Sequence, residues 1–532
     1  MIETVAVGSA PNTQRATALS MPFARALAWL DLPLLMILSM QALVSTALLH
    51  NSAFQDEGLY LYAGRQIVTH WVGGPPPIEN YAYYFSGYPY IYPVIGGALD
   101  MIGGLQLARW FSLLCMLGVT SIVFFSARRL FSPTAAIFAS AAYASLGTVL
   151  FVGRLATFDA LCLFLIALAT ALAYHVGGSR HYWHVLLLGP IILVAILAKY
   201  AAILLALPAL FVLVATSLSY QGWRRTIPRV ALAIVGLVIS FVVTYILMDK
   251  SAFHAINGST TDRTALIMKP RLELLLHVLA MGGVVYAAGL IGLALVFVYH
   301  KRLRLISLAW FVSSLLAPAY HLYKQEAVSI DKHIAYGLFF AMPLAGYALA
   351  WLSTEMQVKF TRSVGASWLV GMSAVLIIFC LGLQQAQSIY GQWANTSNLS
   401  YILHTQMRDG SGRYLIEDIE VARFDAKDVT EPWQWNGLAY FYYVDAQHHQ
   451  LLGDPALKDS IENQYFALIE LSFNAHPADA FYAAQQMIAT RNYDLIATAP
   501  FHNSFGNGHF YIFRAALVPG HGDFTSMSQV VV

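Results

Sequence analysis

The sequence predicts a polytopic α-helical membrane protein with a small α/β domain at its C-terminal end. Composition is the first observation behind this prediction. Of 532 residues, 58% are hydrophobic and only 11% are charged, and the mean hydropathy is +0.60, whereas about 25% of the residues of a soluble domain are charged. So few charges cannot cover a water-soluble particle of this size, which excludes a soluble enzyme, a disordered protein and a nucleic-acid-binding protein.

Eleven apolar stretches are the second observation, because about 20 apolar residues are enough for a helix to cross a bilayer. They lie near 32–50, 107–127, 133–152, 158–176, 182–199, 201–218, 228–248, 272–299, 304–320, 333–352 and 364–384. The fifth and sixth run together around Lys199, so the number of helices between 182 and 218 stays open. We expect the first stretch to be an uncleaved anchor that follows a cytoplasmic segment, residues 1–31.

The third observation is that the formal net charge of +2 combines two opposite parts. Residues 1–388 hold 23 Lys and Arg against 13 Asp and Glu, a net charge of +10, and residues 389–532 hold 7 against 15, a net charge of −8. Such an asymmetry marks two different environments. We therefore expect a basic transmembrane module over 32–388 and an acidic, water-exposed domain over 389–532.

Clusters of Lys and Arg predict the orientation, since cytoplasmic loops are rich in these residues. If the eleven stretches cross the membrane in alternating directions, four clusters lie on the same side, which is expected to be the cytoplasm. These clusters are Arg128-Arg129, Arg224-Arg225-Arg229, Lys301-Arg302-Arg304 and Lys359-Arg362. The opposite face then carries the loop 51–106 and the C-terminal domain. Within that loop, short interfacial helices are expected over 56–70 and near 93–104, on either side of a run rich in Pro and Tyr.

The C-terminal domain alternates strand-like and helix-like segments. Strands are expected over 413–421, 493–499 and 509–516, and a helix over 459–475. Gly506, Asn507 and Gly508, which separate two short runs, indicate a hairpin. The segment order is that of a small α/β domain on the outer face.

Acidic residues are scarce in the membrane module, so those near its outer face are candidate functional residues. Asp56 and Glu57 directly follow the first stretch, and Asp159 stands where the third stretch turns into the fourth. A plain alternative is that Asp56 and Asp159 only cap the helices that they begin, because Asp is a preferred N-cap residue.

Short motifs in a fixed order carry a resemblance to a known family. They are Asp-Glu-x-x-Tyr at Asp56, Glu57 and Tyr60, then Ala108-Arg109, Arg128-Arg129-Leu130-Phe131, and the segment from Arg154 to Asp159. This order resembles the GT-C glycosyltransferase superfamily, and within it the protein O-mannosyltransferase-like group, which includes the bacterial lipid A aminoarabinose transferases. The resemblance implies an enzyme that takes a sugar from a polyprenyl-phosphate carrier and transfers it to an acceptor glycan, lipid or protein of the cell envelope.

The resemblance also implies that Asp56 is the catalytic carboxylate. Transfer with inversion needs one base to remove the proton of the acceptor hydroxyl as that oxygen attacks the anomeric carbon. Phosphate is already a good leaving group, so the second carboxylic acid of a glycoside hydrolase is not needed. Glu57 and Asp159 are then expected to position the acceptor or orient cationic partners.

Cations near the outer boundary are expected to hold the phosphate of the donor, where negative charge develops. The candidates are Arg65, Arg154, Lys199, Lys324 and Lys332. The alternative for the lysines is an ordinary interfacial anchor, because a Lys near a helix end extends to the lipid headgroups. Next to them, Tyr60, His333 and Tyr336 are candidate substrate contacts.

No group of His, Cys, Asp and Glu has metal-ligand spacing, and residues 84–89, before Pro89, hold no carboxylate where the aminoarabinose transferases carry one. We therefore expect that no cofactor is required, with a divalent metal as the open alternative. The expected partners are the lipid bilayer, the lipid-linked donor and the envelope acceptor, and the expected location is the inner membrane of a bacterium. A multi-pass transporter or lipid flippase is the rival interpretation, although the pseudo-repeated halves common in transporters are not found.

Overall fold

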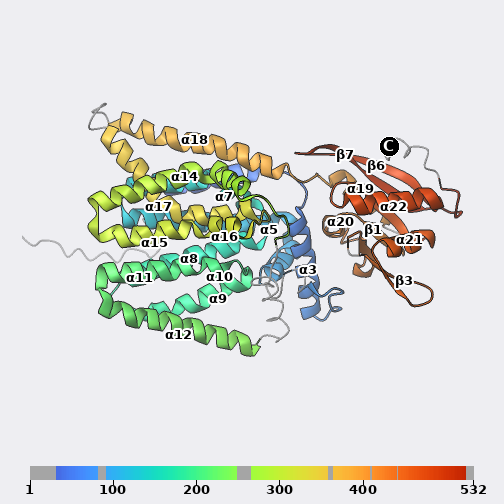
Figure 1. Ribbon diagram of the computed structural model, residues 1–532, viewed down its shortest axis with the longest axis horizontal. Coiled ribbons are helices and arrows are strands. Elements are labelled where there is room, and N and C mark those ends of the chain that lie inside the picture. The colour runs from blue at the N-terminus through green and yellow to red at the C-terminus, as the bar shows by residue number, and fades with distance from the viewer. Residues whose placement is uncertain are drawn as a thin grey trace, which may run out of the picture.

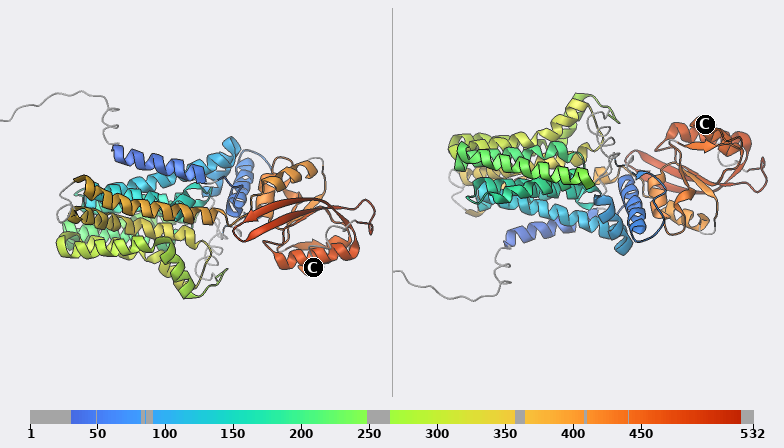
Figure 2. Two further views of the ribbon diagram at one scale, coloured as in Figure 1. Left: turned by 90° about the horizontal axis from the view of Figure 1, so that it is seen from above. Right: turned by 90° about the horizontal axis from the view of Figure 1, so that it is seen from below.

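The computed structural model describes residues 31–48, 50–81, 85, 91–247, 265–356, 364–407, 410–439 and 441–522. Figures 1 and 2 show two bodies along the long axis of the molecule, a bundle of long helices and a smaller α/β body formed by residues that follow the last long helix. Almost all of the expected cytoplasmic segment 1–31, most of the Tyr-rich run and the stretch 84–89 apart from Phe85 lie outside the described residues.

The bundle is formed by helices that cover every expected apolar stretch. They are α2 (Leu32–Leu48), α5 (Ile91–Leu130), α6 (Pro133–Ala144), α7 (Gly147–Arg154), α8 (Phe158–Gly178), η1 (Trp183–Leu187), α9 (Leu188–Ala198), α10 (Ala202–Leu205), α11 (Leu207–Gln221), α12 (Trp223–Leu247), α14 (Arg271–Tyr299), η2 (Lys301–Leu303), α15 (Arg304–Ser314), α16 (Leu316–Lys324), α17 (Ile330–Met356) and α18 (Val364–Tyr390). In the described part, eight helical segments are long and apolar enough to span a membrane, or nine if α6 and α7, bent by 64°, form one span. Leu32–Leu48 and Trp183–Ala198 are shorter apolar helices. The chain is a multi-pass membrane protein.

Burial separates central from peripheral helices. In the most apolar 18-residue segment of α17, 83% of the residues are buried inside the protein, whereas in the corresponding segment of α12 only 11% are buried. The exposed side chains of α12 are nevertheless mainly aliphatic and aromatic, among them Ile239 and Phe241. A helix that is hydrophobic all round but exposed on most of its surface is a lipid-facing membrane helix. The central α17 therefore carries its polar residues into the interior of the protein.

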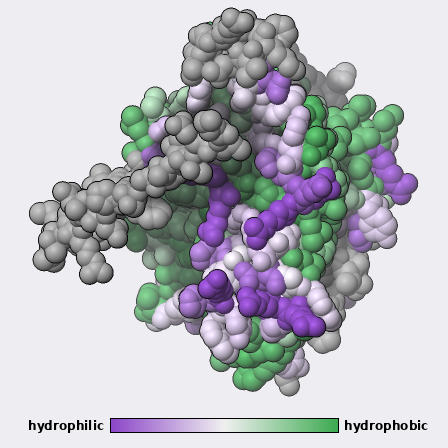
Figure 3. Space-filling view, turned by 90° about the vertical axis from the view of Figure 1, so that its left-hand side faces the viewer, coloured by the Kyte–Doolittle hydropathy of each residue, from purple (hydrophilic) through white to green (hydrophobic). Residues whose placement is uncertain are grey.

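Basic side chains gather at the end of the bundle that is remote from the α/β body, where Figure 3 shows hydrophilic residues between hydrophobic flanks. Arg129 contacts His175 at the end of α8 at 3.0 Å, and Arg229 donates to the carbonyl oxygen of Ser179 at 2.6 Å. Arg302 lies over the ring of Tyr220 at the end of α11. This clustering agrees with the charge pattern, while the assignment of this end to the cytoplasm stays a prediction. Lys359 and Arg362 lie outside the described residues.

The segment after α2 lies across the other end of the bundle. Helix α3 (Gln55–Trp71) agrees with the expected interfacial helix, and the expected segment near 93–104 is the first part of α5, which bends at Gly103 and Gly104. Helices α3 and α5 touch backbone to backbone, since a Cβ atom on Gly64 would come within 1.7 Å of the carbonyl oxygen of Pro93. Only glycine permits this contact, which holds α3 at a fixed place on the bundle.

The C-terminal domain is a mixed sheet with helices on it. Its elements are α19 (Ser397–Met407), β1 (Arg413–Ile416), α20 (Ile419–Asp425), η4 (Pro432–Gln434), β2 (Trp435–Gly437), β3 (Tyr442–Val444), β4 (Gln450–Leu452), α21 (Asp454–Glu462), β5 (Phe466–Leu471), α22 (Pro477–Thr490), β6 (Tyr493–Asn503) and β7 (Gly506–Ala515). The larger sheet has the order β2-β1-β5-β7-β6, with β1 parallel to β2 and β5, and β7 antiparallel to β5 and β6. Strands β3 and β4 form a separate pair.

Two sequence predictions for this domain need correction, and a third is confirmed with a shifted turn. The expected strand over 413–421 ends at Ile416 and gives way to α20, and the expected helix over 459–475 is wrong, because α21 ends at Glu462 and β5 follows. Strand β5 is central and buried along most of its length, so it lacks the alternation that marks a half-exposed strand. The hairpin is confirmed, but its turn is Ser504-Phe505, because Gly506 already pairs with Asn503.

Candidate active site between the bundle and the C-terminal domain

Four charged side chains from distant parts of the sequence form a chain of ion pairs. Lys332 Nζ lies 2.5 Å from Asp56 Oδ2 and 3.7 Å from Asp159 Oδ2, and Lys199 Nζ lies 2.5 Å from Asp159 Oδ1. Two carboxylates and two ammonium groups balance in charge, as buried ions must. The structure thus brings together Asp56, Asp159, Lys199 and Lys332, all of which the sequence singled out.

Each of these side chains stands at the end of a helix. Asp56 is in the first turn of α3, Asp159 in the first turn of α8, and Lys332 in the first turn of α17, while Lys199 is the extended residue that ends α9. The side chain of Asp159 is fully buried and that of Lys332 is 6% exposed, but the side chain of Asp56 is 33% exposed. Asp56 is therefore the end of the chain that a substrate in solution can reach.

Aromatic rings surround the charges. Tyr60 stacks on Phe158 at 4.6 Å between ring centroids, and Lys199 Nζ lies 5.1 Å from the same Phe158 ring. Lys332 Nζ lies 5.2 Å from the ring of Phe54, which is a cation–π distance. The wall restricts water around the cations and strengthens their attraction for an anion.

The two remaining expected substrate contacts lie on α17, beside Lys332. Tyr336 donates its hydroxyl proton to the backbone carbonyl oxygen of Asp159 at 2.9 Å. The His333 ring lies edge-on to the Tyr336 ring and is 2.8 Å from a ring nitrogen of His321. Tyr336 thus orients the start of α8, and His333 joins a polar pair that extends from the ion-pair chain.

Glu57 belongs to a different, fully buried cluster. Its carboxylate accepts two hydrogen bonds from Arg109, at 2.8 and 2.6 Å, and one each from the backbone N–H groups of Ala156 and Phe54, at 2.7 and 2.8 Å. Arg109 also donates to the carbonyl oxygens of residues 51 and 52. Glu57 therefore joins α3, α5 and the segment before α8, and we assign it a positioning role rather than contact with the reacting atoms.

Three of the expected phosphate-binding cations lie outside the ion-pair chain. Arg65 is 3.5 Å from Asp100, which Lys427 of the C-terminal domain approaches at 3.6 Å. Arg154 donates to Gln106 at 2.7 Å and lies over the ring of Trp110 at 5.1 Å. Lys324 is half-buried in the last turn of α16. Their expected role as phosphate ligands stays a prediction.

The C-terminal domain packs directly on α3. A Cβ atom on Gly58 would lie 2.6 Å from the carbonyl oxygen of Glu420, so the first turn of α20 touches α3 two residues after Asp56. Burial raises the pKa of the Glu420 carboxyl; Arg423 opposes the rise, and Glu79 and Asp56 add to it. The domain thus packs against the start of α3 beside Asp56 and covers one side of the site.

Arg423 is the buried centre of this contact and was not expected from the sequence. Its guanidinium group is 2.6 Å from Glu79, pairs with Glu420, and lies over the rings of Tyr62 and Tyr81. Arg109 was missed as a site residue in the same way, although it stood in one of the motifs. In the part of the chain that the structure describes, no group of three His, Cys, Asp or Glu could hold a metal ion, and whether a metal is required stays untested.

A bundle of membrane helices, an interfacial helix with Asp56 and Glu57 in its first turn, and a C-terminal α/β domain form a fold similar to that of solved membrane glycosyltransferases. The resemblance noted in the sequence is confirmed at the level of the fold. The family model described as dolichyl-phosphate-mannose-protein mannosyltransferase matches residues 97–246.

Solved structures with this fold span nearly the whole chain. ArnT from Cupriavidus metallidurans in the apo state matches with a TM-score of 0.62 and 14% identity, covering 92% of this chain and 98% of that one. ArnT bound to undecaprenyl phosphate gives a TM-score of 0.59 at 14% identity, covering 90% and 97%. The oligosaccharyltransferase of Archaeoglobus fulgidus gives 0.54 at 12% identity, covering 91% and 75%. No protein of curated function matches the sequence.

Proposed function

We propose that this protein transfers a sugar from a polyprenyl-phosphate carrier to an acceptor glycan, lipid or protein of the cell envelope, with inversion at the anomeric carbon. The observation that carries the proposal is the ion-pair chain Asp56–Lys332–Asp159–Lys199, placed between the bundle and the C-terminal domain. It combines one partly exposed carboxylate, Asp56, with two buried cations. Two structural neighbours, ArnT and the archaeal oligosaccharyltransferase AglB, have been solved with undecaprenyl phosphate and dolichol phosphate, respectively.

Asp56 acts as the base in this mechanism. It accepts the proton of the acceptor hydroxyl while that oxygen forms a bond to the anomeric carbon from the face opposite the phosphate. The bond between the anomeric carbon and the phosphate oxygen breaks, and the electron pair leaves with polyprenyl phosphate. General-base catalysis of this kind contributes roughly 10²–10⁴-fold to the rate.

Lys332 connects the base to the donor. In the free protein Lys332 Nζ forms an ion pair with Asp56 Oδ2 at 2.5 Å. A phosphate bound between Lys332 and Lys199 competes with both carboxylates for these cations and releases Asp56 to act on the acceptor. Asp159, which is buried and accepts a hydrogen bond from the Thr157 hydroxyl at 3.2 Å, stays in place between the two lysines.

The proposed location is the inner membrane of a bacterium, with the site and the C-terminal domain on the outer face. The clusters of Arg at the opposite end support this orientation, because cytoplasmic ends of membrane helices are rich in Arg and Lys.

The test gives purified protein a labelled polyprenyl-phosphate sugar and an envelope extract. Asp56→Asn is expected to lower the transfer rate at least about 100-fold with only a small change in the unfolding temperature, because Asp56 is partly exposed and Lys332 keeps Asp159 as a counter-ion at 3.7 Å. Asp31→Asn is the matched control, because Asp31 pairs with Arg128 and lies outside the site. If Asp56→Asn folds normally and transfers sugar as fast as the wild type, the proposed mechanism is wrong. Absence of transfer with all common donors would instead favour a transporter or flippase.

A further inference from the structure

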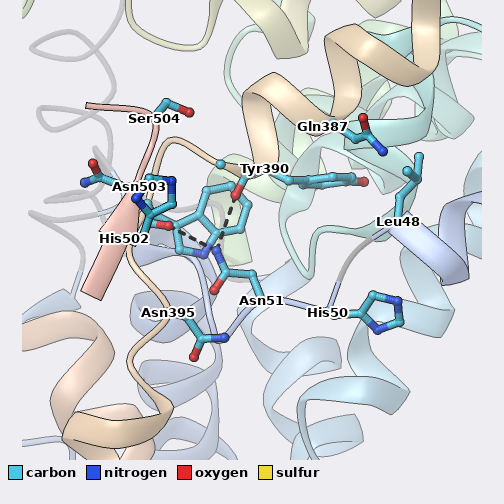
Figure 4. A pocket seen from close by; sticks show the side chains of 11 residues that line it. Leu48, His50, Asn51, Gln387, Tyr390, Asn395, His502, Asn503 and Ser504 are labelled. Carbon is cyan, nitrogen blue, oxygen red and sulfur yellow. Dashed lines mark hydrogen bonds between the residues drawn. The ribbon is translucent and has the colours of Figure 1, made fainter. Parts of the chain in front are cut away.

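A hollow of about 360 Å³ lies beside the site, where the bundle meets the C-terminal domain (Figure 4). Ligand pockets usually have volumes of roughly 300–1,000 Å³. Three distant parts of the chain form its walls, the end of α2 with the residues after it, the end of α18 with the residues after it, and the end of β6. The lining residues are Leu48, His50, Asn51, Gln387, Tyr390, Gly391, Trp393, Asn395, His502, Asn503 and Ser504.

The hollow is held in shape by hydrogen bonds between these parts. Asn51 donates to the carbonyl oxygens of Tyr390 and Trp393, at 3.3 and 3.0 Å, and Figure 4 shows both bonds at the centre of the view. The backbone N–H group of Ser504, in the hairpin turn, donates to the carbonyl oxygen of Gly391 at 2.7 Å. A site that exists before its ligand arrives loses less entropy when the ligand binds.

The chemistry of the lining is polar but uncharged. Among the described residues, it holds four side-chain amides, the serine hydroxyl of Ser504, two imidazoles, and the aromatic side chains of Tyr390 and Trp393, and none of the lining residues is Asp, Glu, Lys or Arg. Several amides are also free to bind a ligand. Among the described residues, the side-chain amide of Gln387, the Nδ2 group of Asn395 and the Nδ2 group of Asn503 have no hydrogen-bond partner, and Asn503 is only 3% exposed.

This chemistry matches carbohydrate hydroxyl groups, each of which both donates and accepts a hydrogen bond, as a side-chain amide does. A phosphate or a carboxylate in the ligand would require cations, which the lining lacks. An acyl chain would leave the amides unsatisfied, at a cost of about 1–3 kcal/mol for each buried group. A peptide would require apolar pockets for its side chains, and among the described residues of the lining only Leu48 has an aliphatic side chain.

The hollow is close to the proposed base through a short series of contacts. The ring of Trp393, in the lining, packs on the ring of Phe54 at 5.0 Å between centroids. Phe54 in turn lies 5.2 Å from Lys332 Nζ, which is 2.5 Å from Asp56. The hollow and the base thus lie near each other, separated by the rings of Trp393 and Phe54, so a chain of sugars that extends past these rings could contact both.

We propose that this hollow is a subsite for an uncharged glycan and that the acceptor of the enzyme is a neutral glycan chain. The assignment of the ligand as acceptor rests on the proposed function, whereas the binding of a neutral glycan by the hollow does not depend on it. Gln387 and Asn395 hydrogen-bond the sugar hydroxyls, and Trp393 offers a ring face.

The test probes the full-length protein in detergent against an array of neutral hexose and pentose oligosaccharides, the same chains carrying uronic acid or phosphate groups, and unglycosylated peptides. The wild type is expected to bind neutral chains. The double variant Gln387→Ala/Asn395→Ala is expected to bind them about tenfold more weakly, since two hydrogen bonds of about 0.5–1.5 kcal/mol are lost. Gln392→Ala is the matched control, because Gln392 is exposed on the same segment but does not line the hollow; it is expected to bind as the wild type.

Preference for the charged chains or for peptides, lack of binding to every neutral chain, or equal binding by the double variant would each overturn the subsite. Capture of polyprenyl phosphate, measured separately by native mass spectrometry, reports on the proposed function. Capture of the lipid together with loss of glycan selectivity refutes the subsite alone. Conversely, selective glycan binding without lipid capture and without transfer refutes the proposed function alone. With a transferred glycan in hand, the double variant is expected to raise the KM for the acceptor and leave kcat and the KM for the donor unchanged.

Discussion

Asp56 and Glu57 are adjacent in the sequence, yet the structure predicts opposite consequences when each loses its charge. The Glu57 carboxylate is fully buried and accepts four hydrogen bonds, two of them from the buried guanidinium group of Arg109. In Glu57→Gln, one acceptor becomes an NH₂ group that faces other donors, and Arg109 keeps a buried charge without a counter-ion. Breaking a buried ion pair in this way costs about 3–5 kcal/mol.

The assay is thermal unfolding of the purified protein in detergent, combined with the rate of sugar transfer per folded molecule. Glu57→Gln is expected to lower the unfolding temperature by several degrees, and the folded fraction is expected to keep much of its activity, since the Asp56–Lys332 pair is not touched. Asp56→Asn is expected to do the reverse. The double variant Glu57→Gln/Arg109→Gln is expected to recover part of the lost stability, because no unpaired charge remains.

A Glu57→Gln protein as stable as the wild type but unable to transfer sugar would refute this reasoning. Glu57 would then act on the substrate, and the buried cluster would have to open during the reaction.

Further predictions concern Lys332, the contact between the two bodies, and the C-terminal domain. Lys332→Gln is expected to lower kcat/KM for transfer roughly 10²–10³-fold, against no change for Lys458→Gln in the remote α21, as initial rates over a range of donor concentrations would show. Arg423→Gln leaves the half-buried Glu79 carboxylate and the mostly buried Glu420 carboxylate close together without their shared cation, so limited proteolysis of the intact protein is expected to cut between bundle and domain faster than in the wild type; an unchanged cleavage rate would contradict the docking role. Burial, with Glu420 and Glu417, raises the pKa of Asp418 in the folded protein to about 7. As the pH rises, this carboxyl loses its proton in the unfolded chain at a lower pH than in the folded protein, so above pH 7 it lowers the free energy of unfolding. Asp418→Asn is therefore expected to raise the unfolding temperature at pH 8 and change it little at pH 4; a gain at pH 4 that equals the gain at pH 8 would disprove the assignment.

Much of the bundle could be predicted from the sequence because lipid imposes a simple rule. Backbone groups in a bilayer must be satisfied within the segment itself, so each apolar stretch becomes a helix whatever its neighbours are. All eleven expected stretches are helical for this reason. The C-terminal domain follows no such rule. The apolar run 466–471 is equally compatible with helix and strand, and it forms a strand because it pairs with β1 and β7 on either side.

Part of the candidate site could also be predicted from the energetics of residues in lipid. Asp56 and Asp159 could be identified because acidic residues are rare in the membrane module, where a charge is energetically costly. Lys199 and Lys332 were identified by their place near helix ends, and the structure puts all four residues in one chain of ion pairs. Arg423 carried no such signal, because arginine is common in a water-exposed domain and only docking on α3 buries it.

By itself, then, the sequence determined the class of molecule, its membrane helices and the scarce charges worth testing, since hydropathy and the cost of a charge in lipid act residue by residue. Only the tertiary structure decided the partners. The packing pairs Glu57 with the buried guanidinium group of Arg109 and leaves the neighbouring Asp56 partly exposed. It also assembles the amide-lined hollow from residues that lie more than 300 positions apart in the chain. Such contacts depend on how helices and sheet pack together, which no local pattern records.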